Sequence, residues 1–120
     1  MSRPSELIAV AVRNLVREVP ALGRLKLVVR LELRGRGDVQ VYRVRVPGPQ
    51  IAKGEPEDAR LELAMARSDF NELAEKGTVV QWREAYDAGR IRAAGDPDIQ
   101  RLLATVIERQ LARARLKKAH

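Results

Sequence analysis

The side chains in this sequence that are best suited to acid–base chemistry are carboxylates, and they fall into two groups. Glu55, Glu57 and Asp58 lie close together, and Asp96 and Asp98 form a second pair. Paired carboxylates act as general acid and base when their surroundings separate their pKa values. The first group lies in a proline-rich stretch, and the second begins an expected helix, where acidic side chains complement the helix dipole. Neither group predicts catalysis, and we expect a protein that is not an enzyme.

Other reactive or metal-binding residue types are scarce. The sequence has no cysteine, and its one histidine is His120. The absence of cysteine excludes disulfides, thiolate metal sites and a cysteine nucleophile. A single terminal histidine excludes a histidine-dependent triad and a metal site with several histidines. Gly35 and Gly37 lie in an expected hairpin turn, not between a strand and a helix as in a phosphate-binding loop. We expect no metal and no cofactor.

Composition describes one domain, residues 1–120, with an aliphatic core. Hydrophobic residues make up 45% of the 120 positions, but aromatic residues only 3%. The net charge of +7 favours anionic partners such as anionic lipid or acyl-CoA-like molecules. Nucleic acid is disfavoured as a partner, because few aromatic residues are present for base stacking. With no leader pattern and no long apolar run, we expect a cytoplasmic protein.

The first half of the chain is predicted to form a helix and then strands. Ser5 is a suitable N-cap for the helix, and Pro20 and Gly23 are expected to end it. The apolar phase slips between Val41 and Tyr42, which indicates a bulge or contacts on both faces. Alternation of apolar and polar residues predicts strands at 24–33, 39–46 and 59–66, with a short edge strand at 50–53.

The second half is predicted to be mainly helical. Ser68 is expected to cap a helix at 69–76, and Gly77 to end it. A helix at 79–88, a strand at 90–94 and a long final helix capped by Asp96 follow. Because the last strand follows a helical crossover, a parallel pairing with a neighbour is left open beside an antiparallel one. The fold class is α+β: a single curved, mainly antiparallel sheet of about five strands with helices packed on one face.

Residues 59–107 contain the run RLELAMARSDFNEL, a following glycine, and a helix ending in EAYDAGRIRAAGD. In this order and spacing they resemble the sterol carrier protein type 2 domain family. The resemblance implies a five-stranded sheet and an apolar tunnel that holds a sterol, fatty acid, acyl-CoA or phospholipid, with no metal and no catalytic residue. The matching positions are Asp69, Phe70, Leu73, Gly77, Ala85, Tyr86, Gly89, Arg90, Ile91, Gly95 and Asp96.

Because of this resemblance, a stripe of apolar residues is a candidate lining for a lipid pocket between the sheet and the last helix. Arg90 and Arg92 are the candidates for meeting a carboxylate or phosphate head. The alternative is that these residues form a filled core, so that the domain is a non-catalytic interaction or dimerisation module, for example a homodimer. The candidate lining residues are Leu63, Met65, Phe70, Leu73, Trp82, Tyr86, Ile91, Ala93, Leu102, Leu103, Val106 and Ile107.

The C-terminal segment 113–120 is basic, and no acidic residue follows Glu108. Arg109, Arg113 and Lys117 recur every four residues and would share one helix face. This pattern suits peripheral contact with an anionic membrane or an acidic partner. A solvated, frayed tail is the alternative.

Overall fold

The computed structural model of the protein describes residues 3–119, in which five strands form one mixed sheet. The strand order is β3-β2-β1-β4-β5, and neighbours are antiparallel except for the parallel pair β1 and β4. The predicted α+β class is therefore confirmed. The strands are β1 (Leu27–Arg34), β2 (Val39–Val46), β3 (Gln50–Lys53), β4 (Leu61–Ala66) and β5 (Ile91–Gly95).

The structure decides two points that the sequence left open in the sheet. The last strand, β5, is antiparallel to β4, because the two short helices between them return the chain alongside the strand it just left. Of the two alternatives at the phase slip, the bulge is absent from the described pairing, since every residue of β1 has a partner in β2. Val41 lies half-buried on the outer face, opposite Glu32, which fits the alternative of contacts on both faces. The apolar phase slips because Gln40 takes an inward position, where its Oε1 accepts a hydrogen bond from the Tyr42 hydroxyl at 3.0 Å.

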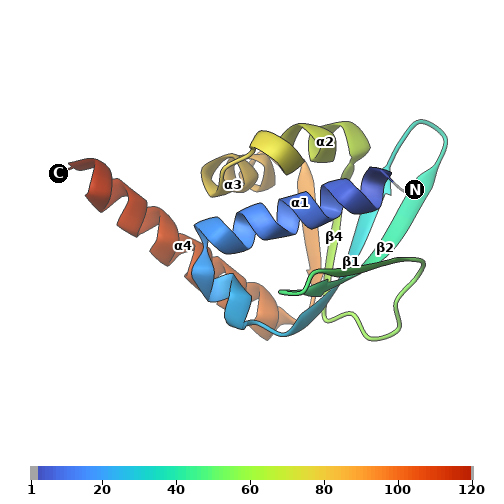
Figure 1. The fold of residues 1–120 in the computed structure, drawn as a ribbon, viewed down its shortest axis with the longest axis horizontal. Helices are drawn as coiled ribbons and strands as arrows, with labels where there is room; N and C mark the ends of the chain where they lie inside the picture. The colour runs from blue at the N-terminus through green and yellow to red at the C-terminus, as the bar shows by residue number, and fades with distance from the viewer. Residues whose placement is uncertain (1–2, 120) are drawn as a thin grey trace.

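Within residues 3–119, four α-helices and a short 3₁₀ helix complete the fold. In Figure 1, α1 lies across the sheet, and α2 and α3 lie beside α1. Helix α4 extends away from the sheet, so that the two chain ends are far apart. The protein is elongated as a result, with extents of 47 × 26 × 26 Å. The helices are α1 (Arg3–Glu18), η1 (Pro20–Arg24), α2 (Arg67–Lys76), α3 (Val79–Asp87) and α4 (Pro97–Ala119).

Helix starts follow side-chain capping only in part. The Asp96 carboxylate accepts a hydrogen bond from the Asp98 amide at 2.9 Å, which confirms Asp96 as the cap of α4. Ser68 is not a cap, because α2 begins one residue earlier, at Arg67. Ser5 is not a cap either, since α1 begins at Arg3. Thr78 caps α3 in a capping box, which the sequence analysis missed.

Alternate residues of the strands face the helices and form the core. On β1 the inward residues are buried and the intervening ones are only half-buried. This period of two is the expected result of the strand's alternating side-chain direction. The opposite face carries charged pairs instead, such as Arg43 Nη2 with Asp58 Oδ2 at 2.7 Å. The inner face is therefore where an apolar ligand could lie.

Candidate functional site

An apolar cavity of about 370 Å³ lies between the inner face of the sheet and the helices α1, α3 and α4. Its walls include Val29 of β1, Leu63 of β4, Leu15 of α1 and Leu103 of α4. Ligand sites are concave and mostly apolar, with a few polar groups that fix orientation. This cavity has that character.

The cavity arises where the inward side chains become smaller toward the β5 edge of the sheet. One row across the sheet runs from Leu31 through Leu63 to Ala93, which are paired in register. The next row ends at Gly95, which has no side chain and pairs with Leu61. The small Ala93 side chain lines the cavity and leaves space between β5 and α4. Gly95 does not line it, because a Cβ there would meet the Arg60 carbonyl oxygen at 2.5 Å.

Helix α4 covers this space without filling it. None of its side chains that the structure describes, at positions 97–117, is fully buried. Its residues that line the cavity are Gln100, Leu103, Ala104 and Ile107, which recur at the spacing of one helix face. The helix is therefore a roof over the cavity.

Most of the candidate lining residues do come together around this cavity. Leu73, Leu102 and Val106 do not. Leu73 is buried in the core beneath α2, and Leu102 and Val106 lie off the face that α4 turns inward, with Leu102 41% exposed. The candidates that line the cavity are Leu63, Met65, Phe70, Trp82, Tyr86, Ile91, Ala93, Leu103 and Ile107.

Neither arginine expected to meet a charged head lines the cavity. Arg92 alternates with Ile91 and Ala93 along β5, so it faces away from the helices. Arg90 lies before the strand, with its Nη1 3.6 Å from Asp69 Oδ1. Strand alternation opposes the assignment of Arg92, and the ion pair with Asp69 engages Arg90 outside the cavity.

Arg83 of α3 is the charged residue that does line the cavity, among those the structure describes. Its Nε lies 3.1 Å from Asp87 Oδ1, and its Nη1 donates to Glu108 Oε1 on α4. The hydrogen bonds to Glu108 and then Asp87 raise the pKa of Arg83 above its ordinary value. The guanidinium is therefore held charged where α3 meets α4.

No protein-family model matches the sequence, and no curated protein matches it. Solved structures do match. The sterol carrier protein domain 2 of Helicoverpa armigera superposes with a TM-score of 0.61 at 10% identity, covering 88% of this chain and 85% of that chain. The palmitated SCP2L2 from Aedes aegypti superposes with a TM-score of 0.58 at 19% identity, covering 83% and 93% of the two chains.

This chain has the sterol carrier protein 2 fold. The crystal structure of Sterol Carrier Protein 2 Like 2 from Aedes aegypti agrees, with a TM-score of 0.55 at 18% identity over 86% of this chain and 98% of that one. The expected resemblance is thereby confirmed. Because the identities are this low, the likeness concerns the fold.

Within the sterol carrier protein 2 fold, the first half of the chain supplies walls that the sequence analysis missed. The resemblance covers only residues 59–107, so the candidate list left out α1, η1, β1 and β2. Five further lining residues lie within that stretch and were missed as well: Leu61, Val79, Arg83, Gln100 and Ala104. The apolar stripe of α1 was the available signal, because its members recur at helical spacing. The missed lining residues are Ile8, Ala11, Val12, Leu15, Val16, Leu22, Leu25, Leu27, Val29, Leu31, Val44, Val46, Leu61, Val79, Arg83, Gln100 and Ala104.

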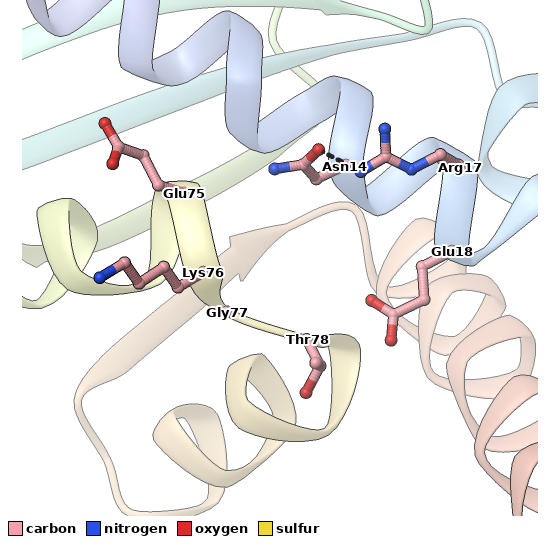
Figure 2. A pocket seen from close by; sticks show the side chains of 7 residues that line it. All are labelled: Asn14, Arg17, Glu18, Glu75, Lys76, Gly77 and Thr78. Atoms are coloured by element: carbon pink, nitrogen blue, oxygen red, sulfur yellow. Dashed lines mark hydrogen bonds between the residues drawn. The ribbon is translucent and has the colours of Figure 1, made fainter.

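A second hollow of about 340 Å³ lies where the end of α1 meets the junction of α2 and α3. Figure 2 shows that charged and polar side chains surround it. These groups bond to the protein itself: Asn14 Nδ2 donates to the Ala74 carbonyl at 3.4 Å, and Glu18 Oε2 accepts from the Val79 amide at 2.8 Å. This hollow is a polar seam that ties α1 to α2 and α3.

Two absences hold for residues 3–119. No helix there is long and apolar enough to cross a membrane. Within the same range, no group of three or more carboxylate, imidazole or thiol side chains could hold a metal ion.

Proposed function

We propose that this protein is a lipid carrier that holds one acyl chain in the cavity beneath α4 and catalyses no reaction of its own. The observation that carries the proposal is a continuous apolar cavity of about 370 Å³. Ligand pockets span about 300–1,000 Å³. A volume near the lower end favours a single chain over a two-chain phospholipid.

The energetics of the cavity favour occupancy by an apolar ligand. Apolar walls around an empty space lack the dispersion contacts that a filled core makes. Each buried methylene contributes about 0.8 kcal/mol of transfer free energy. An acyl chain would regain those contacts, so most of its affinity would come from burial of its methylenes. A protein with the same fold, SCP2L2 from Aedes aegypti, was solved in a palmitated form.

The carboxylates support a protein without catalysis. Asp58 is paired with Arg43, and this hydrogen bond lowers the pKa of Asp58. Asp96 is paired with Arg60 and caps α4, and these bonds lower its pKa as well. Neither carboxylate lines the cavity. Both are held ionised by partners that organise the fold.

A chain-length series tests the proposal. The protein is purified without detergent and examined by native mass spectrometry for bound lipid, and saturated fatty acids then compete with a fluorescent fatty acid. We expect Kd to fall about fourfold for each added methylene until the cavity is full, and then to level off. An interaction module with a filled core would give no bound lipid and no saturable competition, which would overturn the proposal.

Contact with a membrane is the second part of the proposed carrier function. Beyond the cavity, α4 carries exposed Arg109, Arg113 and Lys117, together with Leu116, which is 63% exposed. Each basic residue near an anionic bilayer contributes about 1 kcal/mol. We expect sedimentation with vesicles that contain anionic lipid, and little with zwitterionic vesicles. If a homodimer forms instead, light scattering would give twice the monomer mass, and the basic residues could be changed without effect.

A further inference from the structure

The polar end of the cavity lies at the contact between α3 and α4. Arg83 lines the cavity from α3, and Ile107 lines it from α4. Glu108 follows Ile107 directly and accepts a hydrogen bond from Arg83 Nη1. The charged pair therefore marks the border between the apolar interior and the surface.

Arg83 already binds two carboxylates of the protein, so its surroundings can accommodate an anionic group. Both Asp87 oxygens lie within reach of its Nε, at 3.1 and 3.3 Å, while Glu108 takes Nη1. A guanidinium binds carboxylate and phosphate through parallel N–H donors. The Arg83 side chain is 34% exposed, so a ligand head can reach it without being taken fully out of water.

We propose that Arg83 binds the anionic head of a single-chain lipid, carboxylate or phosphate, and that Glu108 takes this place when the cavity is empty. This inference rests on the proposed acyl-chain binding and names the residue that selects the head. Exchange of one carboxylate for another leaves the number of ion pairs at Arg83 unchanged.

The exchange is favourable because of where each carboxylate goes. The Glu108 side chain is 49% exposed and can be hydrated after release. An exposed ion pair of this kind stabilises a protein only weakly, so its loss costs little. The incoming head brings its chain into the cavity, and burial of that chain favours the liganded state. Asp87 remains beside Arg83 throughout, as part of the same helix.

The test compares lipids that share one chain and differ only in the head. Palmitate, hexadecyl phosphate and methyl palmitate each compete with a fluorescent fatty acid for wild-type protein, Arg83→Gln and Glu108→Gln. Arg83→Gln is expected to raise the Kd values of palmitate and hexadecyl phosphate by roughly tenfold, because each loses a hydrogen bond to a charged group. Glu108→Gln is expected to lower the Kd values of both anions, because the competing carboxylate has been removed. Methyl palmitate should be nearly unaffected by either change.

Matched controls come from the two arginines outside the cavity. Arg90→Gln and Arg92→Gln remove the same charge from the same protein and should leave all Kd values unchanged. If Arg83→Gln is poorly folded by circular dichroism, Arg83→Lys and Glu108→Gln still carry the test. Lysine keeps the charge but loses the paired donors, so an intermediate loss of anion affinity is expected.

The outcomes separate this inference from the function on which it rests. If Arg83→Gln weakens the ester as much as the acids, Arg83 only shapes the cavity and the inference is wrong. The inference is also wrong if Glu108→Gln weakens the acids. A preference for palmitate over hexadecyl phosphate would identify the head as a carboxylate, and the reverse would identify a phosphate. If neither acid nor ester binds the wild type, the proposed function itself fails.

Discussion

Replacing Ala93 with leucine should fill part of the cavity from its floor. Ala93 lies on the inner face of β5, half-buried, and pairs with Leu63. The next residue, Ala94, is exposed on the opposite face and pairs with Glu62. Ala93→Leu and Ala94→Leu therefore add the same group to one strand, but only the first adds it to the cavity.

The size of the effect follows from the added side chain. Leucine adds three carbons to alanine, and three buried methylenes at about 0.8 kcal/mol each amount to about 2.4 kcal/mol. An acyl chain that loses this much burial should bind roughly 60-fold more weakly. The empty Ala93→Leu protein should become more stable by up to the same amount. The cavity of about 370 Å³ leaves room for the new group, so overpacking should add little cost.

Fatty-acid competition and urea unfolding of the lipid-free proteins measure the two effects. We expect Ala93→Leu to lose affinity and gain stability, and Ala94→Leu to keep the wild-type Kd. Equal affinities for the two variants would show that the acyl chain does not lie against β5. A loss of stability in Ala93→Leu would show that the space beneath α4 is already occupied by side chains in solution.

Three other predictions concern the elements that position the cavity. Gly95→Ala should destabilise the protein more than Gly89→Ala. Both glycines have positive φ. A Cβ at Gly95 would lie 2.5 Å from the Arg60 carbonyl oxygen, whereas a Cβ at Gly89 would meet open space. Urea unfolding should show a cost of about 1–2 kcal/mol at Gly89, from the left-handed conformation alone. Thr78→Ala should cost about 1 kcal/mol, because α3 loses its capping box. Asp96→Asn keeps the cap but loses the charged bond to Arg60, which is the largest cause of the lowered pKa of Asp96. The wild type's advantage over this variant should be complete above the ordinary pKa of 3.8 and disappear as the pH falls through the lower folded-state value, as urea midpoints at several pH values would show.

The strands were predictable because their pattern is local. On β1 and β4 each inward residue is apolar, so the period of two fixed both the strand and its inner face. Helix starts were less predictable, since several residues near each start can cap. Ser68 lay inside α2, while Thr78 and Gln81 together capped α3. The parallel pairing of β1 with β4 was not predictable from spacing, because it depends on how the chain crosses the sheet.

The candidate site was predicted on the side where the sequence resembled a known family. Walls from α1 and β1 were missed, because their stripes are equally consistent with a closely packed core. On α4 the predicted stripe was too wide. Leu103 and Ile107 line the cavity, but Leu102 lies off the inward face. A stripe of that width cannot reveal which edge of the helix faces the interior. The expected cytoplasmic location stays a prediction.

The composition of the sequence and the polar contacts of α4 explain why the cavity remains open. The large aromatic side chains that could fill it are rare, at 3% of the sequence. Polar contacts hold α4 near both ends of the cavity, with Asp96 paired to Arg60 at 2.6 Å and Glu108 paired to Arg83. Gln100 Nε2 adds a bond to the Gly95 carbonyl oxygen at 3.1 Å. These contacts orient α4, while its partly buried Ile99 and Leu103 pack against the core.

The contacts of α4 at Asp96 and at Glu108 differ in how easily each can break without disturbing the helix. The contact at Asp96 includes the helix cap, so breaking it would disturb the start of α4. The contact at Glu108 joins a half-buried arginine and an exposed carboxylate, which can separate while the backbone of both helices stays intact. Opening should therefore begin at the Arg83 end. Hydrogen exchange should detect this as faster exchange of α4 amides after Glu108 than of those near Asp96, and slower exchange throughout α4 once an acyl chain is bound.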